Sequence, residues 1–183
     1  MAQGAEKIVL FGHSGGVRRV NYYQAERQDP RVVGLILASG TDRVTAIDPA
    51  RLELAQQLVA AGQGEALLPV PEGESMVFGM QSAAHVVHWE RVVGRFAAQG
   101  HTPWMASIRV PVLATLGASE LEDNPDRRAR VEDMRSRAVQ VPRFDIQVIE
   151  GADHDYTPHS AVCAGAFLGY WLQIPMNPRT ARD

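Results

Sequence analysis

The sequence has very little cysteine and no long apolar run. Its single cysteine, Cys163, cannot form a disulfide within the chain. No apolar stretch approaches the roughly 20 residues that a membrane-spanning helix needs. The polar residues 1–7 are too few for a secretion signal. We therefore expect a cytoplasmic protein that makes no contact with a membrane.

An excess of charge of one sign is also missing. The 18 basic residues include one lysine, Lys7, and are balanced by 21 acidic residues, which gives a formal net charge of -3. Scattered arginines form no basic stripe for a phosphate backbone, so we expect no nucleic-acid partner. The chain is 45% hydrophobic and 21% charged, which is typical of one globular domain with a core of its own.

Apolar runs alternate with amphipathic segments along the chain. Near-continuous apolar runs of four to eight residues are typical of strands that are covered on both faces of a parallel sheet. Strands that alternate with helices form βαβ units with neighbouring parallel strands. The expected strands are 7–11, 32–37, 110–116 and 144–149, and the expected helices of the sheet are 16–27, 125–138 and 160–172. The pattern predicts an α/β fold with a parallel sheet of about four strands and flanking helices.

A long insertion separates the second expected strand from the third. Residues 41–107 contain helical patterns at 49–61 and 82–99 and no strand-like run. An insertion of this size above a parallel sheet usually forms a cap or lid. We therefore expect one domain, 1–183, that carries a helical cap at 41–107.

The segment Gly12-His13-Ser14-Gly15-Gly16 follows the first expected strand directly and precedes a helix. It fits the pattern G-x-S-x-G, in which a serine stands at the tip of a sharp strand-to-helix turn. Side chains two residues before and after that serine would collide, so both positions are expected to require glycine. The alternative is a phosphate-binding glycine turn, but the full G-x-G-x-x-G pattern is absent. Ser14 is therefore the candidate nucleophile.

A serine hydroxyl needs a histidine base, and the base needs a carboxylate that orients it. His154 follows the fourth expected strand, so it lies at the same sheet edge as Ser14. His159 is a weaker competitor. Glu120 is the candidate acid, and we expect residues 118–123 to form the loop that follows the third strand. Its neighbours Glu122 and Asp123 are open alternatives, and the whole acidic cluster could instead be a solvated turn that caps the next helix.

Three segments resemble the α/β-hydrolase superfamily, closest to the siderophore-esterase-like hydrolases. They are residues 8–16 (IVLFGHSGG), 37–43 (LASGTDR) and 151–154 (GADH). The resemblance covers nearly the whole chain, and the order of serine, acid and histidine is that of this fold. It implies a serine hydrolase that cleaves a small carboxylic ester, or an amide or thioester, through an acyl-enzyme without a cofactor. The family acid is more often aspartate, so Glu120 is a departure.

The largest departure from the family lies before the serine. Family members carry roughly a hundred residues ahead of this motif, with the first strands of the sheet and one oxyanion-hole donor, whereas 13 residues precede Ser14 here. The backbone amide of Gly15 is expected to supply the other oxyanion donor. The first strand would be an open apolar edge, so we expect self-association into a homo-oligomer. The alternative to an enzyme is an inactive, truncated hydrolase or fragment that acts as an interaction module.

Three further residues are expected to contact the substrate. His13 is adjacent to Ser14, and Trp104 and Met105 stand where the chain enters the third strand. We predict no metal centre, because His85 and His88 lack the H-E-x-x-H spacing and a third ligand at a predictable distance.

Overall fold

The computed structural model describes residues 6–73, 79–157 and 159–173. The chain divides into two compact units. The sheet unit comprises Met1–Asp42 and Pro103–Asp183, and the insert unit comprises Arg43–Thr102. Each unit is described by itself.

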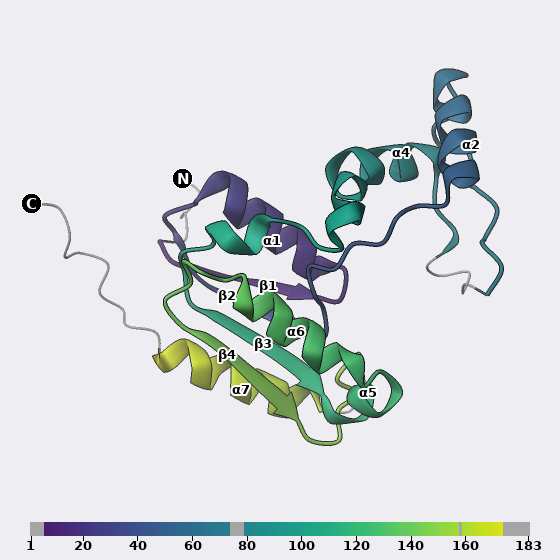
Figure 1. Cartoon of the computed structure of the whole chain (residues 1–183). Coiled ribbons are helices and arrows are strands. Elements are labelled where there is room, and N and C mark those ends of the chain that lie inside the picture. The colour runs from purple at the N-terminus through teal and green to yellow at the C-terminus, as the bar shows by residue number, and fades with distance from the viewer. Residues whose placement is uncertain (1–5, 74–78, 158, 174–183) are drawn as a thin grey trace, which may run out of the picture. The chain divides into compact units, whose positions relative to one another are not determined.

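The sheet unit is built on four parallel strands in the order β1-β2-β3-β4 (Figure 1). The strands are β1 (Ile8–His13), β2 (Val32–Ala38), β3 (Val112–Gly117) and β4 (Phe144–Ile149). They start and end within two residues of the expected bounds. The prediction of an α/β fold with a parallel sheet of about four strands and flanking helices is confirmed. Because all four strands run the same way, the loops that follow them meet at one edge.

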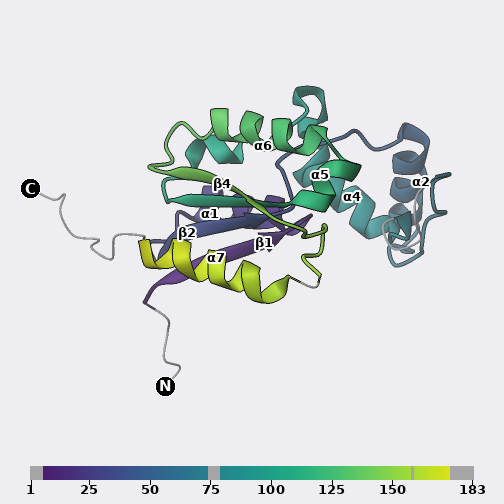
Figure 2. The ribbon, with the colours of Figure 1, turned by 90° about the horizontal axis from the view of Figure 1, so that it is seen from below.

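Helices cover both faces of this sheet. The helices α1 (Gly16–Arg27) and α6 (Asp126–Ser136) lie on one face, and α7 (Ser160–Gln173) lies on the other (Figure 2). A 3-10 helix, η2 (Trp104–Ser107), leads into β3. Among the described residues, no helix combines the length and the apolar character that crossing a membrane requires.

The two faces of β2 belong to different apolar clusters. Leu35 and Leu37 pack with Val17 of α1 and with residues of α6, and none of these three side chains is exposed. Ile36 and Ala38 point the other way and join clusters that include residues of α7. The strand is therefore buried on both sides, as its unbroken apolar sequence predicts.

The insert unit is helical. It contains α2 (Pro49–Ala60), α4 (Ala83–Val92) and the 3-10 helix η1 (Gly94–Gln99). The side chains of Asp48 and Ser82 accept backbone hydrogen bonds at the starts of α2 and α4, which caps both helices. The expected insertion at 41–107 is wider than this unit, because η2 belongs to the sheet unit. Its role as a cap stays a prediction.

The segment after β3 differs from the expectation. Residues 118–123 were expected to form a loop, but they form a short helix, α5 (Ala118–Asp123). Glu120 therefore sits on the first turn of a helix that begins directly at the end of β3, and it is 3% exposed.

Candidate active site

Ser14 occupies a sharp turn between β1 and α1. Its φ angle is +53°, in the left-handed region that side chains with a Cβ rarely adopt. The backbone amide of Ser14 donates a hydrogen bond of 2.8 Å to the carbonyl oxygen of Ala38, at the end of β2. This bond fixes the strained turn at the carboxyl edge of the sheet.

The space around the turn explains two of the glycines. A Cβ on Gly12 would lie 2.7 Å from the carbonyl oxygen of Gly16, and a Cβ on Gly40 would lie 2.4 Å from that of Ser14. Both distances are shorter than a real Cβ contact allows, so both positions need glycine. A Cβ on Gly16 would meet nothing within 4 Å. The expectation that Gly16 must be glycine for steric reasons is therefore wrong, and the sequence analysis missed Gly40.

The structure brings Ser14, His154 and Glu120 together. The Nε2 atom of His154 lies 3.1 Å from the Oγ of Ser14, and its Nδ1 lies 2.6 Å from Oε1 of Glu120. The side chain of Glu120 is 1% exposed and that of His154 is 35% exposed. A buried carboxylate thus holds an accessible imidazole against the serine hydroxyl, which is the geometry of an acyl-transfer triad. The alternatives Glu122 and Asp123 are both exposed.

Further groups surround the carboxylate of Glu120. The hydroxyl of Ser39 donates to its Oε2 at 2.6 Å, and the backbone amide of Gly117 donates to the same oxygen at 3.4 Å. Arg127 of α6 places its Nε 3.1 Å from Oε1 in an ion pair. The positive guanidinium and the donors offset the cost of burying the acid.

A chain of hydroxyls continues from Ser39 into the sheet. The hydroxyl of Tyr156 lies 2.9 Å from Ser39 Oγ and 2.8 Å from Thr115 Oγ1. Burial raises the pKa of Tyr156, so its hydroxyl keeps its proton at neutral pH. Arg127 also donates from Nη1 to the carbonyl oxygen of Ser39 at 2.9 Å. These contacts hold Ser39, at the left-handed φ of +47°, against the acid.

Sequence reasoning missed Ser39, Arg127 and Tyr156. One signal was present for Ser39, which is followed by a glycine at the end of an expected strand. Arg127 is one of many arginines in a polar helix, and Tyr156 stands in a loop. Their meeting at Glu120 depends on tertiary structure.

The expected substrate contacts have different placements. His13 lies beside the triad: its Nε2 is 2.8 Å from the carbonyl oxygen of His154, and the two rings are 5.0 Å apart. Trp104 is 4% exposed with its ring 5.0 Å from that of Tyr22, and Met105 is fully buried in the core under α1 and α6. The apolar entry to β3 packs these two side chains inside the sheet unit, which leaves them almost no surface for a ligand.

Gly15 stands at the amino end of α1 and is exposed. Backbone amides at such an end point away from the helix and carry partial positive charge. This placement suits the expected oxyanion donor, which stays a prediction. For a metal ion, His13, His154 and Asp155 form a group of possible ligands at this edge.

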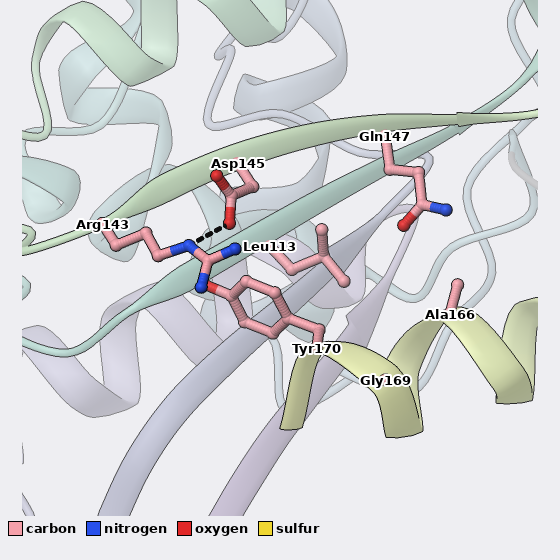
Figure 3. Close-up of a pocket in the computed structure, with 7 residues that line it drawn as sticks. All are labelled: Leu113, Arg143, Asp145, Gln147, Ala166, Gly169 and Tyr170. Atoms are coloured by element: carbon pink, nitrogen blue, oxygen red, sulfur yellow. Dashed lines mark ion pairs between the residues drawn. The ribbon is translucent and has the colours of Figure 1, made fainter. Parts of the chain in front are cut away.

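A second group of polar residues lines a cavity of about 330 Å³ near the start of β3 and β4 (Figure 3). Its polar members are Arg143, Asp145, Gln147 and Tyr170. Arg143 pairs with Asp145 at 2.5 Å and lies over the ring of Tyr170, 5.2 Å from its centre (Figure 3). This cavity has no serine, cysteine or histidine among its lining residues, so it lacks the nucleophile and the histidine base of a serine or cysteine hydrolase.

The sheet unit has the α/β-hydrolase fold, to which the similar solved structures belong. No protein-family model and no curated protein sequence matches the chain. Solved structures do match. The chain is similar to a monoacylglycerol lipase from Paleococcus ferrophilus, with 20% identity over 91% of this chain and 68% of the lipase and a TM-score of 0.57.

Two other solved structures are similar to a comparable degree. MenH from S. aureus is 18% identical over 91% of this chain and 68% of its own, with a TM-score of 0.54. The thioesterase domain from the curacin biosynthetic pathway is 15% identical over 90% of this chain and 66% of its own, with a TM-score of 0.53. This chain thus spans about two thirds of the length of these proteins. At such identities the similarity shows the shared fold.

Proposed function

We propose that this chain is a serine hydrolase that cleaves a carboxylic ester through an acyl-enzyme. One observation carries the proposal: Ser14, His154 and Glu120 form a continuous hydrogen-bonded series at the carboxyl edge of the sheet. The series runs from a half-buried serine to a buried carboxylate.

In the first step, Ser14 Oγ attacks the ester carbonyl carbon while His154 Nε2 takes the hydroxyl proton. Glu120 accepts the Nδ1–H of His154 and stabilises the imidazolium that forms. The amide of Gly15 donates to the oxyanion of the tetrahedral intermediate. His154 then protonates the alcohol that leaves, and an acyl group remains on Ser14.

In the second step, His154 Nε2 takes a proton from water, which attacks the acyl carbon. The tetrahedral intermediate collapses, Ser14 regains its proton from His154, and a carboxylic acid leaves. No step needs a cofactor. Among the similar structures, a lipase and a thioesterase domain act on acyl esters and thioesters by their names. These names support an acyl substrate, with amides and thioesters as further candidates.

The test is the release of p-nitrophenol from short p-nitrophenyl esters by the purified chain. We expect turnover that falls by about 10⁶-fold in Ser14→Ala, the loss seen when a triad nucleophile is removed. Ser136→Ala is the matched control, because Ser136 is an exposed serine on α6 that bonds its own helix at the carbonyl of Asp133. Turnover that is equal in both variants would overturn the proposal.

A second candidate function, a self-associating interaction module, rests on β1. Within the described sheet β1 is an edge strand, and its Phe11 is 51% exposed. An apolar strand edge is a template for pairing with another copy. We expect a concentration-dependent dimer in sedimentation velocity that Phe11→Lys weakens. A monomer at all concentrations would contradict this self-association.

A further inference from the structure

Three potential metal ligands converge at the accessible side of the candidate active site. His13, His154 and Asp155 each offer one ligand atom, and these atoms all lie within 4.8 Å of one another. Nε2 of His13 is 3.9 Å from Oδ1 of Asp155. The side chains of His13 and Asp155 are 33% and 74% exposed, so an ion from solvent can reach them.

The types of ligand favour a transition-metal ion over Mg²⁺. Two imidazole nitrogens and one carboxylate oxygen suit Zn²⁺, which accepts three protein ligands and leaves its fourth position open in many sites. Mg²⁺ prefers oxygen ligands in an octahedral arrangement, so it does not fit this set.

The contact between Glu120 and His154 favours metal binding by His154 as well as catalysis. A metal-binding histidine usually donates its second ring N–H to a carboxylate, which orients the ring and makes the other nitrogen a better ligand. Nδ1 of His154 is 2.6 Å from Oε1 of Glu120, so Nε2 remains as the ligand atom. The triad thus already supplies the carboxylate–histidine pair of a zinc site.

Binding requires a small rearrangement. Tetrahedral bonds of about 2.0–2.1 Å bring ligand atoms to roughly 3.4 Å from one another, so atoms up to 4.8 Å apart must move closer. Nε2 of His13 contacts the carbonyl oxygen of His154 at 2.8 Å, and as a donor there it holds the ring proton. His13 must move this proton to Nδ1 and turn toward the ion. Its partial exposure leaves room for that turn.

We propose that Zn²⁺ binds to His13, His154 and Asp155 and switches the hydrolase off. Zinc on Nε2 of His154 occupies the atom that must take the proton of Ser14. The inhibition rests on the proposed function, whereas the binding does not. Chelation of the ion restores the free imidazole, so the inhibition is reversible.

The binding is tested by titrating the full chain with ZnCl₂ in a calorimeter, and with Co²⁺ as a spectroscopic probe of tetrahedral coordination. We expect one Zn²⁺ per chain, a visible Co²⁺ absorption band, and affinity at least about tenfold lower in both Asp155→Asn and His13→Gln. Loss of a residue that only supports a metal ligand already costs about 10- to 100-fold, so loss of a direct ligand should cost at least as much. The matched control for His13→Gln is His88→Gln, which removes a histidine of α4 outside the proposed site. This variant should bind Zn²⁺ as the wild type does. No binding, or equal affinity in all variants, would overturn the site.

The inhibition is tested by ester hydrolysis with and without Zn²⁺, followed by addition of EDTA. We expect loss of turnover that EDTA reverses, with a half-inhibiting Zn²⁺ concentration at least about tenfold higher in Asp155→Asn. If Zn²⁺ binds but leaves the hydrolysis unchanged, the switch is refuted. If Zn²⁺ binds at these residues and no ester is cleaved by metal-free protein, the site stands and the proposed function fails.

Discussion

The two ends of the sheet carry the same three kinds of side chain in different surroundings. Each end has a carboxylate, an arginine and a buried tyrosine. The set beyond the carboxyl ends of the strands is Glu120, Arg127 and Tyr156, and the set near the amino ends is Asp145, Arg143 and Tyr170 (Figure 3). In each set the arginine pairs with the carboxylate.

The tyrosines show how the two ends differ. The hydroxyl of Tyr156 contacts both Ser39 and Thr115, whereas the buried hydroxyl of Tyr170 makes no hydrogen bond within the described part of the chain. Burial raises the pKa of both tyrosines. A buried polar group therefore does not by itself mark a reactive site. What distinguishes the carboxyl end is a network that continues to a histidine and a serine.

Substitution of the two carboxylates should give the largest difference in kcat between the two ends of the sheet. Glu120→Gln places an amide where His154 needs an acceptor, which favours the imidazole tautomer that cannot take the proton of Ser14. We expect kcat for ester hydrolysis to fall by about 10⁴-fold. Asp145→Asn at the other end should leave kcat unchanged. An equal loss of kcat in both variants would contradict the difference that we expect between the two ends.

Substitution of the two arginines should give a smaller difference between the two ends, seen in kcat/KM. Arg127→Met removes two contacts of the guanidinium, the ion pair with Glu120 and the hydrogen bond to the carbonyl oxygen of Ser39. A hydrogen bond that involves a charged group contributes about 1.5–3 kcal/mol. We expect kcat/KM to fall by roughly 10- to 100-fold, mainly through kcat, because the acid is no longer held in place. Partial recovery in Arg127→Lys would support a positioning role.

Arg143→Met is the matched control at the amino end. Its ion pair with Asp145 does not touch the triad, so steady-state kinetics should match the wild type. Loss of kcat in this variant would mean that the two ends are coupled.

The tyrosines give the smallest contrast, which is in stability. Tyr156→Phe leaves Ser39 and Thr115 without their shared partner, and we expect the free energy of unfolding to drop by about 1–3 kcal/mol in urea denaturation. Tyr170→Phe removes a hydroxyl without a hydrogen bond and keeps the ring under Arg143. Its free energy of unfolding should stay within about 0.5 kcal/mol of the wild type or rise. The reverse order would show that the hydroxyl of Tyr170 has a stabilising partner.

Much of the sheet unit could be predicted from the sequence, because strands buried on both faces appear as unbroken apolar runs. The expected helix at 16–27 and the strand at 144–149 match the structure in both bounds. The candidate triad followed from the G-x-S-x-G motif at Ser14 and from position, because Ser14, Glu120 and His154 each come after a strand of one parallel sheet. The structure brings these three side chains within hydrogen-bond distance.

The surroundings of the acid could not be predicted, because they come from separate elements. Ser39 follows β2, Arg127 belongs to α6 and Tyr156 lies beyond β4, so no local pattern links them. The short helix α5 was missed because its six residues are too few for a clear period. Trp104 was expected to contact the substrate because it stands where the chain enters the third strand, but its ring packs against Tyr22 there and is 4% exposed.

The most direct test is the intact mass of the full chain after incubation with a fluorophosphonate. Such a probe attaches to a serine only when the hydroxyl is activated by its base. We predict one adduct per chain on Ser14, with no adduct in Ser14→Ala or His154→Ala and an unchanged adduct in Ser136→Ala. A folded wild-type chain that gains no mass, or that gains the same mass in the Ser14 variant, would contradict the assignment of Ser14, His154 and Glu120 as a working triad.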